Sequence, residues 1–128
     1  MSAFYLHLIS DSTGATLHGL ARACLAQFDA QNPEERFWNM VRSDRQLEFV
    51  LDGISKNPGP VFYTLVNKEH RATLRKHCRS LNLPCMAVLD PLIRGLSHYL
   101  GQEPKAMPGL QHQLNAQYFD RIEAVEYT

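Results

Sequence analysis

The segment with the clearest potential for ligand chemistry follows the first apolar run of the chain. Hydroxyl-bearing residues surround Gly14 in this segment: Ser10, Ser12, Thr13 and Thr16. A glycine lets an anion approach the backbone closely, and hydroxyl groups donate hydrogen bonds to it. If a helix begins here, its unpaired N–H groups and the positive end of its dipole also favour an anion. We therefore predict a phosphate or nucleotide site in residues 10–14 and at Thr16.

Asp11 lies inside this segment and complicates the prediction, although we count it among the candidate ligand residues. Its carboxylate would repel an anion unless it points away, caps the helix or holds a metal ion. A plain helix cap made by one of these short polar side chains explains the segment as well as a ligand site does. The segment is not a phosphate loop of the G-x-x-x-x-G-K-[ST] type, because that spacing and its lysine are missing.

A second candidate is a basic stripe on a predicted helix, in which four cations recur at helical spacing: Lys68, Arg71, Arg75 and Arg79. Such a stripe can dock an acidic partner surface or a phosphate group. A solvated helix face accounts for the same pattern. We carry partner docking forward as a hypothesis.

A third candidate is a connector rich in proline, glycine and amide side chains, residues 108–115, where Gln111 and His112 could reach a ligand. The same side chains could instead satisfy the backbone groups of a loop. The three cysteines, Cys24, Cys78 and Cys85, show neither C-x-x-C nor zinc-like spacing, so we predict buried or half-buried reduced thiols. The histidines form no H-E-x-x-H pair, and we predict no metal site.

The elements that must position these residues follow from apolar periodicity. Four short apolar runs indicate strands within residues 4–9, 36–41, 61–66 and 83–89. Between the first two, an apolar stripe at helical spacing indicates a helix that packs on a sheet: Leu17, Leu20, Ala21, Cys24, Leu25 and Phe28. In the third helix, Leu74, Cys78 and Leu81 recur on one side and should face inward.

Helix starts and stops are marked by short polar residues, proline and glycine. Ser43 has Gln46 three residues later, which is the spacing of a capping box, and Asn67 should cap the next helix. Asp90, followed by a proline, should cap the fourth helix, and Gly101 should end it.

Strands that alternate with helices imply right-handed crossovers and an α/β fold. We predict a single domain over residues 1–102 with an open, mostly parallel four-stranded sheet, helices on both faces and a Rossmann-like or flavodoxin-like strand order. Residues 103–128 should form a connector and a helix that carries Tyr118, Ile122 and Val125 inward. This helix would lead toward a carboxyl-terminal phosphate-loop domain that the sequence does not contain.

The composition excludes several classes of protein. The 128 residues suit one domain, and the 13 basic and 13 acidic residues cancel. The chain therefore lacks the basic excess that nucleic-acid binding usually requires. No apolar run approaches the roughly 18 residues that span a bilayer, and the start lacks the features of a signal peptide. We expect a cytoplasmic protein that binds neither nucleic acid nor membrane.

Three stretches in this order resemble the regulatory proteins of pyruvate, phosphate dikinase and phosphoenolpyruvate synthase. They are HLISDSTG at residues 7–14, PGLQHQL at residues 108–114 and YFDRIEAVEY at residues 118–127. The resemblance runs along essentially the whole chain, and the last two stretches are its more specific parts. Ala15 departs from the family, which commonly has a glutamate after the glycine.

The resemblance implies a bifunctional serine/threonine phosphotransferase. Such proteins inactivate the dikinase or synthase by phosphorylating a threonine, typically with ADP (or ATP) as donor. They reverse the modification with inorganic phosphate, which releases pyrophosphate. The family's phosphate loop lies in a second half, beyond a point like Thr128. We therefore predict that residues 1–128 are inactive alone, and we assign no catalytic residue. The resemblance leaves homodimer assembly, partner docking or an auxiliary nucleotide or phosphate site at residues 10–14 as roles for this part.

Two other classes of protein are alternatives to a regulatory phosphotransferase. A flavodoxin-like electron carrier holds the phosphate of FMN with a similar hydroxyl-rich loop, although residues 67–70 offer no glycine or aromatic residue to hold a flavin ring. A stand-alone nucleotide- or phosphate-binding interaction module is the other alternative.

Overall fold

Four strands and four helices alternate along residues 4–29 and 32–105, which are the residues that the computed structural model describes. In chain order the elements are β1 (Tyr5–Ser10), α1 (Ala15–Leu25), β2 (Glu34–Trp38), α2 (Asp44–Lys56), β3 (Val61–Thr64), α3 (Lys68–Ser80), β4 (Cys85–Ala87) and α4 (Asp90–Leu100).

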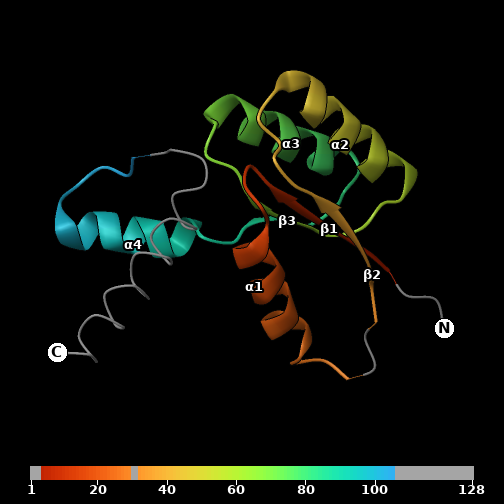
Figure 1. Ribbon diagram of the computed structural model, residues 1–128, viewed down its shortest axis with the longest axis horizontal. Helices are drawn as coiled ribbons and strands as arrows, with labels where there is room; N and C mark the ends of the chain where they lie inside the picture. The colour runs from red at the N-terminus through yellow and green to blue at the C-terminus, as the bar shows by residue number, and fades with distance from the viewer. Residues whose placement is uncertain (1–3, 30–31, 106–128) are drawn as a thin grey trace, which may run out of the picture.

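The strands form one sheet in the order β2-β1-β3-β4, and every pairing is parallel. Parallel neighbours need a crossover connection, and the intervening helices provide it. Helix α1 covers one face of the sheet, α2 and α3 lie together on the other, and α4 extends away from it (Figure 1). The predicted open parallel sheet with helices on both faces is confirmed, as is the flavodoxin-like order.

Strand β1 supplies both hydrophobic cores because its successive side chains point to opposite faces. Leu6 and Leu8 pack with Leu17 and Ala21 of α1. Ile9 belongs to the larger core under α2 and α3, together with buried residues of those helices and of β3: Leu47, Val50, Ile54, Val61, Tyr63, Leu74 and Cys78. Each large apolar side chain buried in this way contributes about 1.5–3 kcal/mol.

His7 is one of the two fully buried polar residues of β1, with Ser10, and the surrounding structure fixes its tautomer. Its Nδ1 atom lies 3.0 Å from the indole Nε1 of Trp38, which can only donate, so Nδ1 accepts. The Nε2 atom therefore carries the hydrogen and donates to the carbonyl oxygen of Asn57 at 2.7 Å. Burial lowers the pKa of His7. The neutral ring thus ties β1 to β2 and to the end of α2.

Two strand boundaries differ from the prediction. The second strand was expected at 36–41 but spans Glu34–Trp38, because its parallel register with β1 begins at the pair Tyr5 and Glu34. After Trp38 the chain leaves the sheet, and Met40 adopts a positive φ of 57°. The third strand ends at Thr64 and not at residue 66, because the chain turns there toward α3.

The predicted burial of Cys24 is wrong, since its side chain is exposed, whereas Cys78 is buried and Cys85 is half-buried. Helix α1 packs on the sheet through Leu17 and Ala21, and Cys24 borders an open groove beside β4. Two other members of the predicted apolar stripes are also exposed. Phe28 lies beyond the end of α1, and Leu81 lies at the C-cap of α3.

Asp90 does not cap α4 as predicted. The N-cap position belongs to Leu89, no side-chain cap forms there, and the Asp90 carboxylate pairs with Arg71 of α3. The other end is as expected, because Gly101 ends the helix in the left-handed conformation at φ 65°. Helix α4 buries none of its residues against the rest of the described chain.

The predicted connector motif with Gln111 and His112, and the helix after Asn115, lie outside the described residues. The domain division at residues 102 and 103 therefore stays a prediction. Within the described residues, no helix is long and apolar enough to cross a membrane.

Candidate functional site

The candidate site lies where β1 and β3, the two central strands, end side by side. The chain leaves β1 for a helix on one face of the sheet and leaves β3 for a helix on the other (Figure 1). This divergence opens a crevice at the carboxyl edge, which is where open α/β sheets bind ligands. The amide of Asp11 donates to the carbonyl of Thr64 at 3.3 Å. This bond joins the two strand exits, the points where the chain leaves β1 and β3.

A small hollow of about 200 Å³, including the part open to solvent, occupies this crevice. Its lining residues are Ser10, Ser12, Thr13, Gly14, Ala15, Thr16, Leu17 and Thr64. The structure thus brings together five of the six residues predicted for the ligand site. Thr64 was not predicted, because its proximity depends on the pairing of β1 with β3.

The start of α1 keeps hydrogen-bond donors free. Its N-cap is Gly14, no side chain caps it, and its first turn contains no acidic residue. The Thr13 hydroxyl reaches the amide of Ala15 at 3.4 Å. No described residue accepts from the amides of Thr13, Gly14 and Thr16. Three N–H groups at the positive end of a helix are therefore available to an anion.

Thr64 gives independent support for a ligand, because its hydroxyl oxygen is buried and has no hydrogen-bond partner among the described residues. The residue is only 9% exposed and lines the hollow. A buried hydroxyl without a partner costs free energy that a bound polar group would restore.

Two features favour glycine at position 14. Its φ of 83° lies in the left-handed region, which other residues rarely adopt. A Cβ atom built on it would lie 2.4 Å from Oδ1 of Asn39, the residue after β2. The glycine therefore lets the loop turn while the Asn39 side chain lies against it.

Asp11 does not line the hollow. Its Oδ2 atom accepts the amide hydrogen of Val66 at 2.9 Å, so the carboxylate faces the turn after β3. The Oδ1 atom is buried without a partner among the described residues. Burial raises the pKa of Asp11, while the Val66 amide and the charge of Arg42 act in the opposite direction. Asp11 thus holds the two strand exits together.

A second stretch of chain lies along the hydroxyl-rich loop. The amides of Met40 and Val41 donate to the carbonyls of Ser12 and Ser10 at 2.9 and 3.0 Å. Arg42 follows, and its Nε donates to the carbonyl of Asp11 at 2.6 Å. Sequence reasoning missed residues 39–42, because no local pattern shows that the segment after β2 pairs with the loop after β1.

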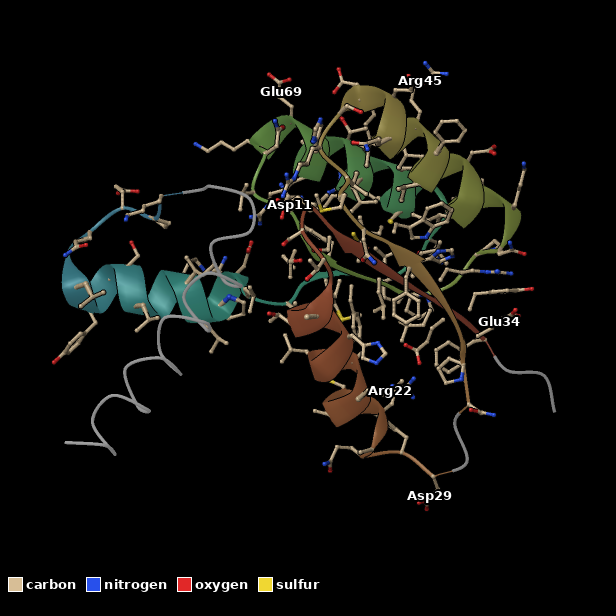
Figure 2. The ribbon with its side chains drawn as sticks, viewed as in Figure 1. Asp11, Arg22, Asp29, Glu34, Arg45 and Glu69 are labelled. Carbon is tan, nitrogen blue, oxygen red and sulfur yellow. The ribbon has the colours of Figure 1, made fainter. Side chains whose placement is uncertain are left out.

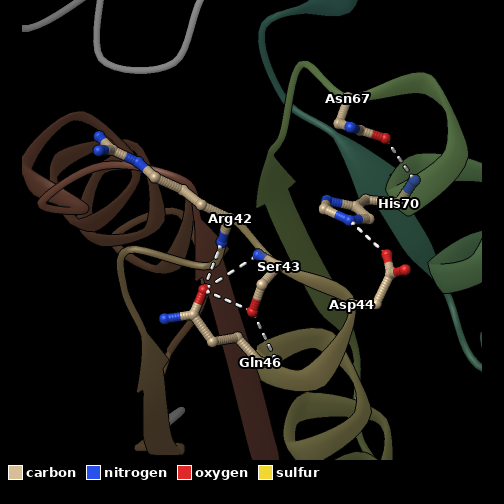
Figure 3. Close-up of polar contacts among 6 residues, drawn as sticks. All are labelled: Arg42, Ser43, Asp44, Gln46, Asn67 and His70. Atoms are coloured by element: carbon tan, nitrogen blue, oxygen red, sulfur yellow. Dashed lines mark hydrogen bonds and ion pairs between the residues drawn. The ribbon is translucent and has the colours of Figure 1, made fainter.

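The neighbouring starts of α2 and α3 are closed by their own side chains (Figure 3). Ser43 accepts from the amide of Gln46 at 3.1 Å, and the Gln46 side chain accepts from the amide of Ser43, which confirms the predicted capping box. Asn67 caps α3 through the amide of His70 at 2.9 Å. The His70 ring contacts Asp44 at 2.9 Å and links the two helix starts.

The four cations of the basic stripe have different surroundings. Arg71 pairs with Asp90, and Arg75 donates to the hydroxyl of Tyr63 at 3.3 Å. Arg75 and Arg79 border a groove of about 450 Å³ together with Asn82, Leu83, Pro84 and Cys85, while Lys68 is exposed. The stripe is therefore not one uniform face of free cations, and its docking role stays a prediction. Among the described residues, no three His, Cys, Asp or Glu side chains cluster as metal ligands would.

The fold defines an open, doubly wound α/β protein with a small polar hollow where its two central strands end. The chain belongs to the kinase/pyrophosphorylase family, whose family model matches residues 6–128.

The chain is 48% identical to proteins of Paramagnetospirillum magneticum and Sphingopyxis alaskensis over 128 residues, all of this chain and 41% and 47% of those proteins. It is 48% identical to a Caulobacter vibrioides protein over 124 residues, 97% of this chain and 39% of that protein. All three are provisionally named as pyruvate, phosphate dikinase regulatory proteins. The chain thus spans less than half the length of these relatives. The match does not favour the flavodoxin-like alternative.

Proposed function

We propose that this chain acts as part of a regulatory phosphotransferase of pyruvate, phosphate dikinase or phosphoenolpyruvate synthase. The proposed reactions are phosphorylation of a threonine on the target with ADP (or ATP), and its removal by inorganic phosphate with release of pyrophosphate. The kinase/pyrophosphorylase family supports the type of chemistry, and the relatives' names support the dikinase as target. The synthase rests on the sequence resemblance alone.

Within that activity, we assign to this chain the binding of a phosphate group at the start of α1. The observation that carries this assignment is the hollow itself, where free amides and hydroxyls surround the unpartnered oxygen of Thr64. Phosphate oxygens are strong acceptors, so they match donors of both kinds. The hollow is narrow, since even its empty volume of about 200 Å³ includes open solvent. We therefore assign to it a single phosphate group at its mouth, with any nucleoside outside it.

Titration calorimetry with inorganic phosphate, ADP and AMP tests the assignment. We expect binding to the unmodified chain and weaker binding to Thr13→Ala and Thr64→Val, because each substitution removes a hydroxyl from the hollow. Asp11→Ala should also weaken binding, by releasing the turn at Val66. Thr73→Val changes an exposed threonine of α3 and is the matched control. An absence of heat with the unmodified chain would remove the site.

We expect no transferase activity from residues 1–128 alone. Phosphoryl transfer requires several positive groups and metal ions placed around the transferred phosphate, and no glycine-rich lysine loop occurs in this sequence. The test is incubation of the purified chain with ADP and the target enzyme, followed by detection of phosphothreonine. Turnover would show that the expectation is wrong.

Partner docking by the basic stripe is the second candidate role, because the groove beside Arg75 and Arg79 presents two guanidinium groups. Arg79→Glu should weaken binding to the target enzyme at low salt. Lys76→Glu, on the same helix but outside the groove, is the control with the same charge change. Homodimer formation and a cytoplasmic location stay predictions.

A further inference from the structure

The Arg42 side chain is fixed against the loop that carries most of the hollow's lining, although Arg42 lies 31 residues along the chain from Asp11, the residue that anchors it. Its Nε donates to the Asp11 carbonyl at 2.6 Å. The two preceding residues, Met40 and Val41, bond through their amides to the loop at Ser12 and Ser10. The backbone just before Arg42 and the Arg42 side chain are therefore both held against the loop that lines the hollow, while the Arg42 amide donates to Oε1 of Gln46 at 2.8 Å.

The anchor at Nε leaves the two terminal nitrogens of Arg42 available. The guanidinium is planar and its C–N bonds are short, so these nitrogens lie within roughly 5 Å of the Asp11 carbonyl. No described carboxylate forms an ion pair with them. Figure 3 shows the guanidinium pointing away from α2 and from Asp44, whose carboxylate contacts His70.

The nearby acidic groups do not neutralise this cation by direct contact. The Asp11 carboxylate faces Val66, and burial raises its pKa, which lowers its tendency to ionise. The donors of the hollow, by contrast, are neutral hydroxyls and amides. They match the shape of a phosphate group but supply no full positive charge.

We infer that Arg42 is the cationic residue of the phosphate site and strengthens its binding of phosphate. This inference rests on the proposed function. Arginine suits the role because its guanidinium group can donate from Nε to the Asp11 carbonyl and still donate from its two terminal nitrogens to phosphate oxygens. A lysine has one nitrogen, which cannot keep the anchor and reach a ligand with the same geometry.

The test measures inorganic phosphate binding by titration calorimetry, at 50 and 200 mM salt, with the whole chain 1–128. Arg42→Gln should weaken binding at least about tenfold, since hydrogen bonds to charged groups are worth that much. It should also reduce the dependence on salt. Arg42→Lys keeps the charge without the anchor and should fall between Arg42→Gln and the unmodified chain.

Arg45→Gln is the matched control, because it removes the same charge from an exposed position on the outside of α2, away from Asp11 (Figure 2). We expect it to bind phosphate as the unmodified chain does. Circular dichroism and melting temperature of both variants establish that they fold, which we expect because both arginines are exposed.

The outcomes separate this inference from the proposed function. No phosphate binding by the unmodified chain removes the proposed site and, with it, the role of Arg42. Binding that is equal in the unmodified chain and Arg42→Gln overturns the inference about Arg42 alone. Equal weakening by Arg42→Gln and Arg45→Gln also overturns it, because the effect would then be one of overall charge.

Discussion

Helices α1, α2 and α3 all begin at the carboxyl edge of the same parallel sheet, yet their first turns are finished differently. Helix α2 has the capping box of Ser43, and α3 has the Asn67 cap. Each also has an acidic residue in its first turn, Asp44 in α2 and Glu69 in α3. Helix α1 has neither a side-chain cap on Gly14 nor an acidic residue in its first turn.

The difference shows which helix start has hydrogen-bond donors that no described residue satisfies. The donors at the start of α2 and α3 are partly satisfied from within, and nearby carboxylates offset the dipole, so these ends stabilise the fold. The donors at the start of α1 remain for water or a ligand. The unpartnered hydroxyl of Thr64 lies beside this start. The contrast therefore marks the start of α1 as the candidate site more sharply than the loop sequence does.

The largest expected effect comes from closing the turn that makes α1 different. Gly14→Val places a β-branched side chain at φ 83° and against Asn39. We expect a loss of about 2–3 kcal/mol in the free energy of unfolding, because such residues rarely adopt this conformation. Urea denaturation measures it. Gly19→Val, in the same helix with open space around its Cα, is the control and should cost less.

The next effect comes from making α1 resemble α3. Thr16→Glu puts an acidic residue in the first turn of α1, as Glu69 does in α3. We expect phosphate affinity to fall about tenfold, equivalent to about 1.4 kcal/mol, through repulsion and a neutralised dipole. Thr16→Gln has a similar shape without the charge and separates the two causes. Undiminished binding of phosphate by Thr16→Glu would place the ligand elsewhere.

A smaller effect comes from opening the start of α3. Asn67→Ala removes the acceptor for the His70 amide, and we expect a cost of about 1 kcal/mol in the free energy of unfolding. Asn67→Asp keeps an acceptor and should cost less. Phosphate affinity should stay unchanged in both, as calorimetry can measure. A new phosphate site in Asn67→Ala would show that any open helix start in this protein suffices.

The smallest effect concerns the pH dependence of Asp11, which joins the two strand exits. Because burial raises the pKa of Asp11 in the folded state, its contribution is most favourable at low pH, where the carboxyl is protonated in both states. That contribution falls as the pH rises from the ordinary value of 3.8 through the raised value.

Urea denaturation between pH 4 and 7 tests this sign with Asp11→Asn, which cannot ionise. The unmodified chain should lose stability relative to the variant as the pH rises. The charges of Arg42 and His70 favour ionised Asp11, so they reduce the expected difference in slope, while burial sets its sign. Parallel curves for the two proteins would contradict the expected shift.

The sequence predicted the strands and helices well because their signals are local. The apolar runs located all four strands, and the cap signals at Ser43 and Asn67 proved correct. Prediction failed at Asp90 and Cys24, where distant contacts decide. Arg71 pairs with the Asp90 carboxylate, and Cys24 is exposed at the border of an open groove beside β4.

For the candidate site, the sequence indicated the loop of residues 10–14 from its hydroxyls and glycine. It gave no sign of Thr64, Asn39 or Arg42, because each joins the loop through strand pairing or the chain after a different strand. It also left the direction of the Asp11 carboxylate open. The bond to the Val66 amide turns that carboxylate toward the exit of β3.

By itself, the sequence determined the α/β alternation, the parallel sheet and the position of a hydroxyl-rich turn at a helix start, because period, caps and composition act over a few residues. Only the tertiary structure decided which helix start remains open and which cation lies beside it. The physical reason is that the strand order β2-β1-β3-β4 brings residues 10–16, 39–42 and 64 to one edge of the sheet. No local sequence pattern predicts that these three segments lie close together.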